Sequence, residues 1–435
     1  MASFMNRIYR AMPWIIILFT MWVIANINLK KDYGTGVIEA DGKGYFSYLP
    51  AIFIYHDLNF GFFYDIERVK YYKENLYYNY IRVHNNHIFN KYYAGTALAM
   101  MPFYLIGHGM TLITGSDPDG YSYWYTLMVH LGALFYLFAG LIAIRKLLRA
   151  YGIRENFIAF TLGSIVFGTN LFYYTAVEFS MSHVYSFAFI AWFVYTVHLY
   201  FEKPKGSLII ISGVLLGIIA LIRPVNLIIL LSLPFIAGSR EKFTAGLKEL
   251  IAFRLSTIAG ILACGAIGGL QLLIYKLQTG SFFVYSYQGE GFNFLKPHIP
   301  EVLFSYRKGL FLYTPLLLFT LVGFRYLYKQ SRFSAWWLAI FFIVLTYIIS
   351  SWHMWFYGGS FSQRVYIDFY IFFAILLALA YQSIRPPSLQ KAFITFTFVL
   401  VLFCQFQTYQ YRHMIIHWSD MNKEKYWEVM FKLPK

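Results

Sequence analysis

The sequence predicts an all-α polytopic membrane protein, and three observations support this fold class. Of the 435 residues, 59% are hydrophobic and only 13% are charged, whereas ordinary soluble domains carry about 25% charged residues. Long apolar runs recur from one end of the chain to the other, and most are long enough to cross a bilayer as helices. The basic residues lie mainly in short connections between these runs. We therefore expect a single membrane domain over residues 1–435.

The formal net charge of +16 raises the question of a nucleic-acid partner. We exclude one, because the positive charge is spread over short loops between apolar runs and does not form a soluble basic face. The two cysteines, Cys264 and Cys404, each lie inside an apolar run. We expect buried thiols there, which indicate nothing about the redox compartment.

The first apolar run covers residues 13–29 and follows Arg7 and Arg10. It is long enough to cross a membrane, and no small-x-small cleavage site follows it. We therefore predict an uncleaved first span with its N-terminus in the cytoplasm, as expected for a multi-pass membrane protein.

A long outer loop, residues 30–121, should follow this span and carry two interfacial helices. The first covers about 44–56, is rich in aromatic residues, and has Asp41 placed to cap it. The second covers 94–114, a run that is long enough to span instead.

Charge decides between these two placements of 94–114. If this run is interfacial, the cytoplasmic side carries 17 of the 36 Lys and Arg residues but only 4 of the 20 acids. If it spans, every basic connection downstream moves outside, against the positive-inside rule. The interfacial placement also puts the 276–308 loop and the 411–435 tail outside. It gives eleven spans, at about 13–29, 122–144, 157–176, 184–201, 207–222, 224–237, 255–275, 309–328, 333–351, 365–382 and 391–410.

Residues 207–237 form one apolar stretch that is interrupted only by Arg223 and Pro224. Proline breaks a helix because it lacks the N–H and clashes with the preceding turn. We expect two short segments that meet near the outer surface, with Arg223 at the turn.

Three acids follow the first span closely. Glu39 and Asp41 flank one residue just outside the membrane, where a carboxylate could accept a proton from a hydroxyl or help to hold a divalent cation. The same spacing also suits a helix cap beside a solvated charge. Asp57 lies where the first interfacial helix should end and could be a turn residue.

Further polar residues on the outer side are candidates for substrate or metal contacts. His84 and His87 lie three apart, but two histidines alone do not complete a metal site. Glu178 and His183 lie in another short outer loop, where they could be interface residues or could contact a sugar.

Four cations lie at the outer ends of spans, where the positive-inside rule does not favour them. Their placement indicates an anionic ligand, such as a phosphate, on that side. Lys91 could instead extend to the interface, and Arg364 could pair with Asp368 four residues later on one helix. The four are Lys91, Arg223, Arg307 and Arg364.

This arrangement resembles the GT-C superfamily of integral-membrane glycosyltransferases, which includes protein O-mannosyltransferases and bacterial aminoarabinose transferases. The resemblance covers nearly the whole chain. It includes a long outer loop after the first span, two interfacial helices, and four short motifs. These are Glu39-Ala40-Asp41, Asn90-Lys91-Tyr92-Tyr93-Ala94-Gly95, Leu221-Ile222-Arg223-Pro224 and Gly358-Gly359-Ser360-Phe361-Ser362-Gln363-Arg364.

The resemblance implies a bundle like that of the superfamily, and a polyprenyl-phosphate-linked sugar as the donor. It also implies transfer with inversion to a lipid, glycan or protein acceptor on the outer face, with Asp41 at the family's acidic position. Asn90 stands where relatives often carry Glu, and Tyr92 stands where they carry Pro. These departures leave metal dependence open.

Two other functions compete with this hypothesis. A transporter or flippase for a lipid-linked sugar should place ionisable residues near the bilayer midplane and often contains inverted repeats. Here the ionisable residues gather at the outer ends of spans, and the sequence contains no evident repeat. An oligosaccharide ligase would use a large late outer loop, but the 276–308 loop contains only the acids Glu290 and Glu301.

Overall fold

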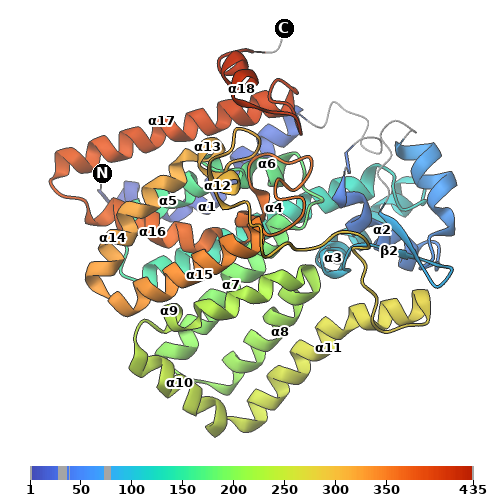
Figure 1. Ribbon diagram of the computed structural model, residues 1–435, viewed down its shortest axis with the longest axis horizontal. Helices are drawn as coiled ribbons and strands as arrows, with labels where there is room; N and C mark the ends of the chain where they lie inside the picture. Colours follow the sequence, from blue (N-terminus) through green and yellow to red (C-terminus); the bar gives the residue numbers. More distant parts are fainter. Residues whose placement is uncertain (1, 28–36, 39, 73–79, 434–435) are drawn as a thin grey trace.

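The computed structural model describes residues 2–27, 37–38, 40–72 and 80–433, and helices dominate this part of the chain (Figure 1). Eight helices among the described residues are long and apolar enough to cross a membrane, which confirms the predicted all-α polytopic class. They are α1 (Ala2–Ile27), α3 (Gly95–Thr114), α4 (Tyr123–Ala150), α7 (His183–Glu202), α11 (Arg254–Thr279), α15 (Arg332–Ser350), α16 (Tyr370–Ser383) with the preceding 3-10 turn η6 (Arg364–Phe369), and α17 (Pro387–Arg412).

Shorter apolar segments complete the bundle. They are α5 (Glu155–Phe167), α8 (Gly206–Ile222), and the 3-10 helix η4 (Pro224–Ser232) with α9 (Leu233–Ala237). The predicted break in the 207–237 run is confirmed. The backbone of Arg223 is extended, with φ −152° and ψ 108°, and Pro224 opens η4.

The eight long and three short apolar segments of the described chain differ from the predicted set of eleven spans, because they include α3 and lack a segment over 309–328. The expected 309–328 span is wrong as one helix, because it divides into α13 (Leu310–Tyr313), η5 (Pro315–Phe319) and α14 (Thr320–Gln330). Pro315 accounts for the interruption, since it cannot donate the helical hydrogen bond. The expected 157–176 span is also divided, into α5 and α6 (Leu171–Ala176). Helix α3 is itself long enough to span, so its interfacial placement stays a prediction.

The region between α1 and α3 contains α2 (Asp41–Phe53), η1 (Gly61–Phe63), η2 (Tyr64–Tyr72) and a two-stranded hairpin. Strands β1 (Ile81–His84) and β2 (His87–Asn90) pair antiparallel, with His84 opposite His87. The turn residues Asn85 and Asn86 have φ 51° and 64°. Such values are typical of a two-residue hairpin turn, and asparagine tolerates them. No strand is predicted from the sequence in this region.

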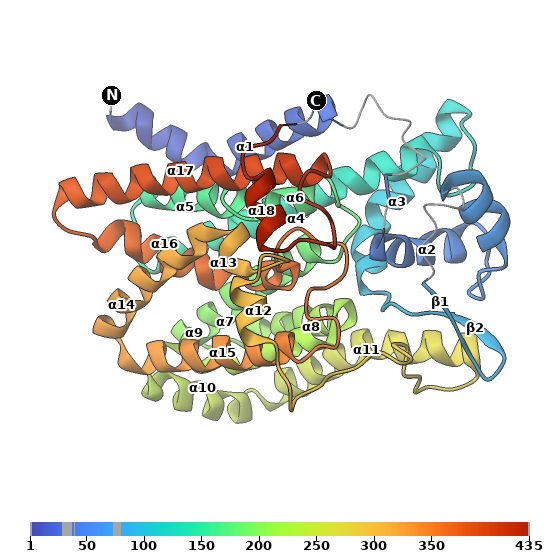
Figure 2. The ribbon, with the colours of Figure 1, turned by 45° about the horizontal axis from the view of Figure 1, so that its top comes forward.

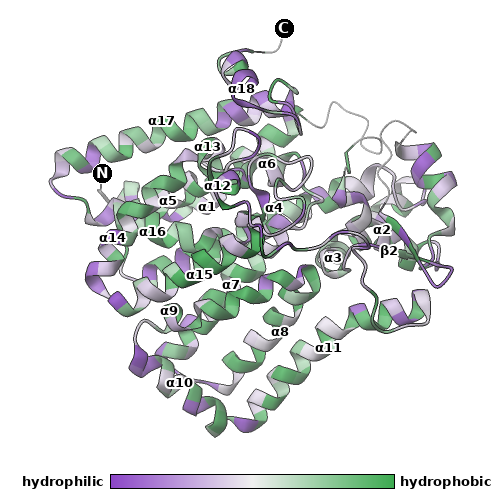
Figure 3. Ribbon diagram, viewed as in Figure 1, coloured by the Kyte–Doolittle hydropathy of each residue, from purple (hydrophilic) through white to green (hydrophobic). Residues whose placement is uncertain are grey.

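The core of the bundle lies on α16, which is almost wholly buried, whereas α11 and α17 expose most of their apolar surface. Figure 3 shows the hydrophobic colouring along both exposed helices. Figure 2 shows α11 along one edge, with the β1–β2 hairpin near its C-terminal end. The connections α10 (Arg240–Ala252) and α12 (Ile299–Phe304) and the tail helix α18 (Lys423–Val429) complete the described elements.

Candidate active-site cavity

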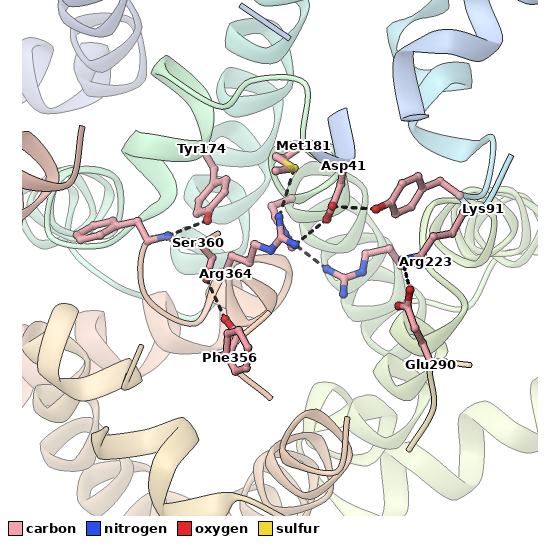
Figure 4. Close-up of polar contacts among 12 residues, drawn as sticks. Asp41, Lys91, Tyr174, Met181, Arg223, Glu290, Phe356, Ser360 and Arg364 are labelled. Atoms are coloured by element: carbon pink, nitrogen blue, oxygen red, sulfur yellow. Dashed lines mark hydrogen bonds and ion pairs between the residues drawn. The ribbon is translucent and has the colours of Figure 1, made fainter. Parts of the chain in front are cut away.

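A cavity of about 1440 Å³ opens where the ends of several elements meet. Its walls come from the start of α2, the β2–α3 connection, the α6–α7 loop and the α8–η4 break, together with the 285–292 and 352–364 loops and the end of α17. Six of the predicted site residues line this one space: Asp41, Lys91, Glu178, His183, Arg223 and Arg364. Figure 4 shows the polar contacts around Asp41, Lys91 and Arg364.

Asp41 is the first residue of α2, and its side chain points into the cavity. The preceding Ala40 has φ 47°, a left-handed conformation that an alanine rarely adopts, and this bend directs the chain into α2. Asp41 Oδ1 accepts a hydrogen bond from the Tyr92 hydroxyl at 2.8 Å, and Oδ2 pairs with Arg364 Nη2 at 2.6 Å. The expected helix cap is therefore wrong, because no side chain caps α2.

Neighbouring groups keep the Asp41 carboxylate ionised. Burial alone would raise the pKa of Asp41, but Arg364, the Tyr92 hydroxyl and Lys91 together bring this pKa below its ordinary value. Asp41 is therefore ionised at neutral pH.

Arg364 pairs with Asp41 and not with Asp368, the alternative partner four residues later. It begins the 3-10 helix η6, whose tighter winding changes the direction of side chains relative to an α-helix. Its guanidinium is nearly buried and contacts Asp41 and Met181 Sδ, the latter at 3.4 Å. The i,i+4 pair with Asp368 is not formed, because Asp368 contacts His183 and Asn226 instead.

Lys91 lies on the opposite wall of the cavity and is only 6% exposed. Its Nζ pairs with Glu290 Oε1 at 2.5 Å and lies 5.0 Å from the centre of the Tyr287 ring. Arg82 Nη2 lies 3.6 Å from the same carboxylate oxygen. The sequence identified Lys91, but it did not identify Glu290 as its partner, because 199 residues separate the two.

A buried polar network underlies the third wall. Asp368, which is fully buried, pairs through Oδ1 with His183 Nδ1 at 2.9 Å and accepts a hydrogen bond on Oδ2 from Asn226 Nδ2 at 2.8 Å. Arg223 Nη1 lies 3.2 Å from His183 Nδ1 and 3.6 Å from Asp368 Oδ2. Sequence reasoning named His183 and Arg223 but assigned no such part to Asp368 or Asn226.

Two further buried residues, Glu178 and Lys308, are close enough to the Asp41–Arg364 pair to interact with its charges. Burial raises the pKa of Glu178 to about 7, although Arg364 and the Tyr173 hydroxyl, which donates at 3.0 Å, act in the opposite direction. Burial likewise lowers the pKa of Lys308 to about 7. Lys308 donates to the carbonyls of Ser360 and Trp418 and is 2% exposed. No pattern around Lys308 in the sequence signals this burial.

Other predicted site residues lie outside the cavity. Arg307 packs its guanidinium 3.4 Å from the centre of the Phe356 ring and lines a separate hollow of about 420 Å³. Asp57 accepts hydrogen bonds from the backbone N–H groups of Asn59 and Gly61, which is the turn alternative. His84 and His87 are hairpin residues, and Glu39 falls outside the described residues.

A divalent cation does not fit the described part of this site. No group of three His, Cys, Asp or Glu side chains suited to a metal ion occurs within residues 40–72 and 80–433 or the shorter described ranges. We therefore derive no catalytic step through a metal.

No family model and no curated protein matches the sequence. Among solved structures, the chain is similar to the archaeal oligosaccharyltransferase AglB from Archaeoglobus fulgidus, in complex with an inhibitory peptide and a dolichol-phosphate. The match has a TM-score of 0.49 and 12% sequence identity, and covers 97% of this chain. This chain spans 60% of the length of that protein.

Proposed function

We propose that this protein is a membrane glycosyltransferase of the GT-C type that takes a sugar from a polyprenyl-phosphate donor. The observation that carries the proposal is the cavity in which an ionised Asp41 lies among buried cations at the ends of apolar helices. A lipid-linked donor needs a polar pocket for its sugar and phosphate next to an apolar surface for its chain.

The cations fit the donor's phosphate. Lys91, Arg223 and Arg364 line one cavity and come from three separate parts of the chain. When the bond from the sugar to the phosphate breaks, negative charge grows on the leaving phosphate. Fixed cations in a site with little water stabilise this charge more strongly than bulk water does.

The acid fits the acceptor. Asp41 is the proposed base that takes the proton from the attacking hydroxyl, while Glu39 shares its motif. Each carboxylate oxygen has two acceptor positions, so the contacts from Tyr92 and Arg364 leave one position free on each oxygen of Asp41. The hydroxyl oxygen then bonds to the anomeric carbon as the phosphate leaves from the opposite face, which inverts the configuration.

The proposed setting is the outer face of a bacterial cytoplasmic membrane, with the N-terminus inside. The acceptor is a lipid, a glycan or a protein. The chemistry in the cavity requires only a hydroxyl or another nucleophile that can reach the anomeric carbon beside Asp41.

The test uses purified protein in nanodiscs and a panel of radiolabelled polyprenyl-phosphate hexoses, with lipid, glycan and peptide acceptors. We expect release of polyprenyl phosphate that depends on an acceptor, and a product of inverted anomeric configuration. In sealed vesicles, movement of an intact donor across the bilayer without cleavage would identify a flippase instead. Transfer of a whole oligosaccharide from a pyrophosphate carrier would identify a ligase.

A further inference from the structure

The paired side chains of His183 and Asp368 lie beside Arg223 and have no part in the roles proposed above for Asp41 and the cations. Their contacts fix the orientation of the His183 ring. We propose that His183, held by Asp368, accepts a hydrogen bond from a hydroxyl of the donor sugar and so helps to select the sugar. This inference rests on the proposed function. It makes His183 a specificity-determining residue and Asp368 a positioning residue.

The contacts around His183 Nδ1 define which ring nitrogen carries the proton. Asp368 Oδ1, at 2.9 Å, can only accept a hydrogen bond when ionised, whereas Arg223 Nη1, at 3.2 Å, can only donate one. An unprotonated Nδ1 would face the Asp368 oxygen lone pairs at 2.9 Å, and this contact is closer than the 3.2 Å contact with Arg223 Nη1 that a proton on Nδ1 would oppose. We therefore assign the proton to Nδ1, which donates to Asp368, as in other carboxylate–imidazole pairs.

The buried carboxylate is fixed in turn. Asp368 accepts from Asn226 Nδ2 through its second oxygen, and Asn226 Nδ2 also contacts Ser186 Oγ at 3.1 Å. All of these partners are buried. The carboxylate therefore cannot easily rotate, and the imidazole ring is held in one orientation.

The other ring nitrogen, Nε2, is then a hydrogen-bond acceptor. His183 lines the cavity although its surface is only 3% exposed. Its Nε2 has no hydrogen-bond partner among the described residues. The group that such a nitrogen binds is a hydrogen-bond donor, such as a sugar hydroxyl.

The position matches a sugar more closely than a phosphate. An acceptor nitrogen repels phosphate oxygens, so His183 does not extend the cation set to which Arg223 belongs. In the donor the sugar is joined directly to the phosphate. If Arg223 contacts the phosphate, the neighbouring His183 ring, whose Nδ1 lies 3.2 Å from Arg223 Nη1, is within reach of the first sugar hydroxyls through its other side, Nε2.

The experiment is a cycle between protein variants and donor analogues. The donor is the polyprenyl-phosphate hexose that the wild-type protein turns over, together with analogues that each lack one ring hydroxyl. In the wild type we expect one analogue to react with a kcat/KM roughly tenfold lower, the typical loss for one unmade hydrogen bond. In His183→Ala that penalty should fall to about twofold or less, while the penalties of the other analogues stay unchanged.

Three variants separate recognition from structure. His183→Gln, whose amide oxygen can accept near the position of Nε2, should restore the wild-type pattern. Asp368→Asn should lose it, because an amide can donate to Nδ1 and thereby move the ring proton to Nε2. Ser186→Ala removes only the outer contact of Asn226, leaves the hydrogen bond from Asn226 to Asp368 in place and does not alter the cavity lining, so it should keep the wild-type pattern.

Two results would overturn the inference. One is a folded His183→Ala protein that keeps the full wild-type penalty for every analogue. The other is a loss of discrimination in Ser186→Ala equal to that in His183→Ala. A wild-type protein that turns over no polyprenyl-phosphate sugar would instead count against the proposed function itself.

Discussion

At the scale of single residues, two of the cations that line the cavity are already paired with carboxylates. Arg364 is paired with Asp41, and Lys91 is paired with Glu290 from the loop between α11 and α12. An incoming phosphate must therefore compete with a carboxylate for Lys91. The two acids lie on different kinds of element, since Asp41 begins a helix whereas Glu290 lies in a loop.

Glu290→Gln should strengthen donor binding. The change keeps the shape of the side chain but removes the charge that competes for Lys91, so we expect the donor KM to fall about three- to tenfold, as for one charge-assisted contact. Lys91→Ala should act in the opposite direction and weaken donor use by about 1.5–3 kcal/mol. Donor KM values for both variants in nanodiscs test this. A shift in the same direction for both would make the pair purely structural.

The site residues that could be predicted are those that adjoin an apolar run in the sequence, because the run indicates their position relative to the membrane. Asp41, Lys91 and Arg364 lie at the ends of apolar runs, so their depth could be inferred from hydropathy alone. Asp368, Glu290 and Lys308 could not be assigned, because their partners come from distant segments. Arg307 has the same signal as Arg364, yet it packs on Phe356 outside the cavity.

At the scale of elements, close backbone contact joins α8 to α11. A Cβ atom at Gly213 would lie 2.2 Å from the carbonyl oxygen of Gly260, and one at Gly217 would lie 2.9 Å from that of Cys264. Small residues allow such approach between helices in a membrane, where van der Waals packing drives association.

Gly213→Ala should destabilise the protein although alanine favours helices. The added methyl group forces α8 and α11 apart, and overpacking of this kind costs about 1–3 kcal/mol. Gly265→Ala on α11 is the matched control, because a Cβ atom there meets nothing within 4 Å. Thermal unfolding in detergent, followed by tryptophan fluorescence, compares the two. Equal melting temperatures for both variants would show that the glycine contact is unimportant.

Glu67 in η2 should make stability depend on pH. Burial raises the pKa of Glu67 to about 7, although the hydroxyls of Tyr121 and Tyr80 and the charge of Lys43 act in the opposite direction. The unfolded chain loses this proton near pH 4.5, so the folded state is favoured least above about pH 7. The contribution is complete below pH 4.5 and is lost as pH rises through about 7.

The matched variant is Glu67→Gln, which cannot ionise. Between pH 5 and pH 8, the melting temperature of the wild type should fall more steeply than that of Glu67→Gln. Other titrating groups are common to both proteins and cancel in the difference. Parallel curves would mean that Glu67 titrates near its ordinary value in the folded protein.

Element boundaries were predictable where a single residue type decides them. Pro224 predicted the break after α8. Pro315 interrupts the 309–328 run in the same way, and this interruption was not predicted. The β1–β2 hairpin was missed because its strands are only four residues long and lack a clear alternation.

At the scale of the whole molecule, the charge asymmetry predicts the orientation in the membrane. Pro118 lies before α4 and Ala150 is the last residue of this helix, and both positions are exposed. In a variant lacking Cys264 and Cys404, a cysteine at position 118 should react with an impermeant thiol reagent in intact cells. A cysteine at position 150 should react only after the membrane is opened. The reverse pattern would overturn the eleven-span topology and move the cavity to the inner face.

The most direct test of the central claim is the rate at which Asp41→Asn consumes a polyprenyl-phosphate sugar in nanodiscs. Asparagine has nearly the same size, and its one amide oxygen can still accept from Arg364 while its NH2 group faces the Tyr92 hydroxyl oxygen, but it cannot act as the base. We expect a rate about 10²–10⁴-fold below that of the wild type, the usual loss for a general base, measured well below the melting temperature of both proteins. A folded Asp41→Asn protein that turns over its donor within a few-fold of the wild type would contradict the account.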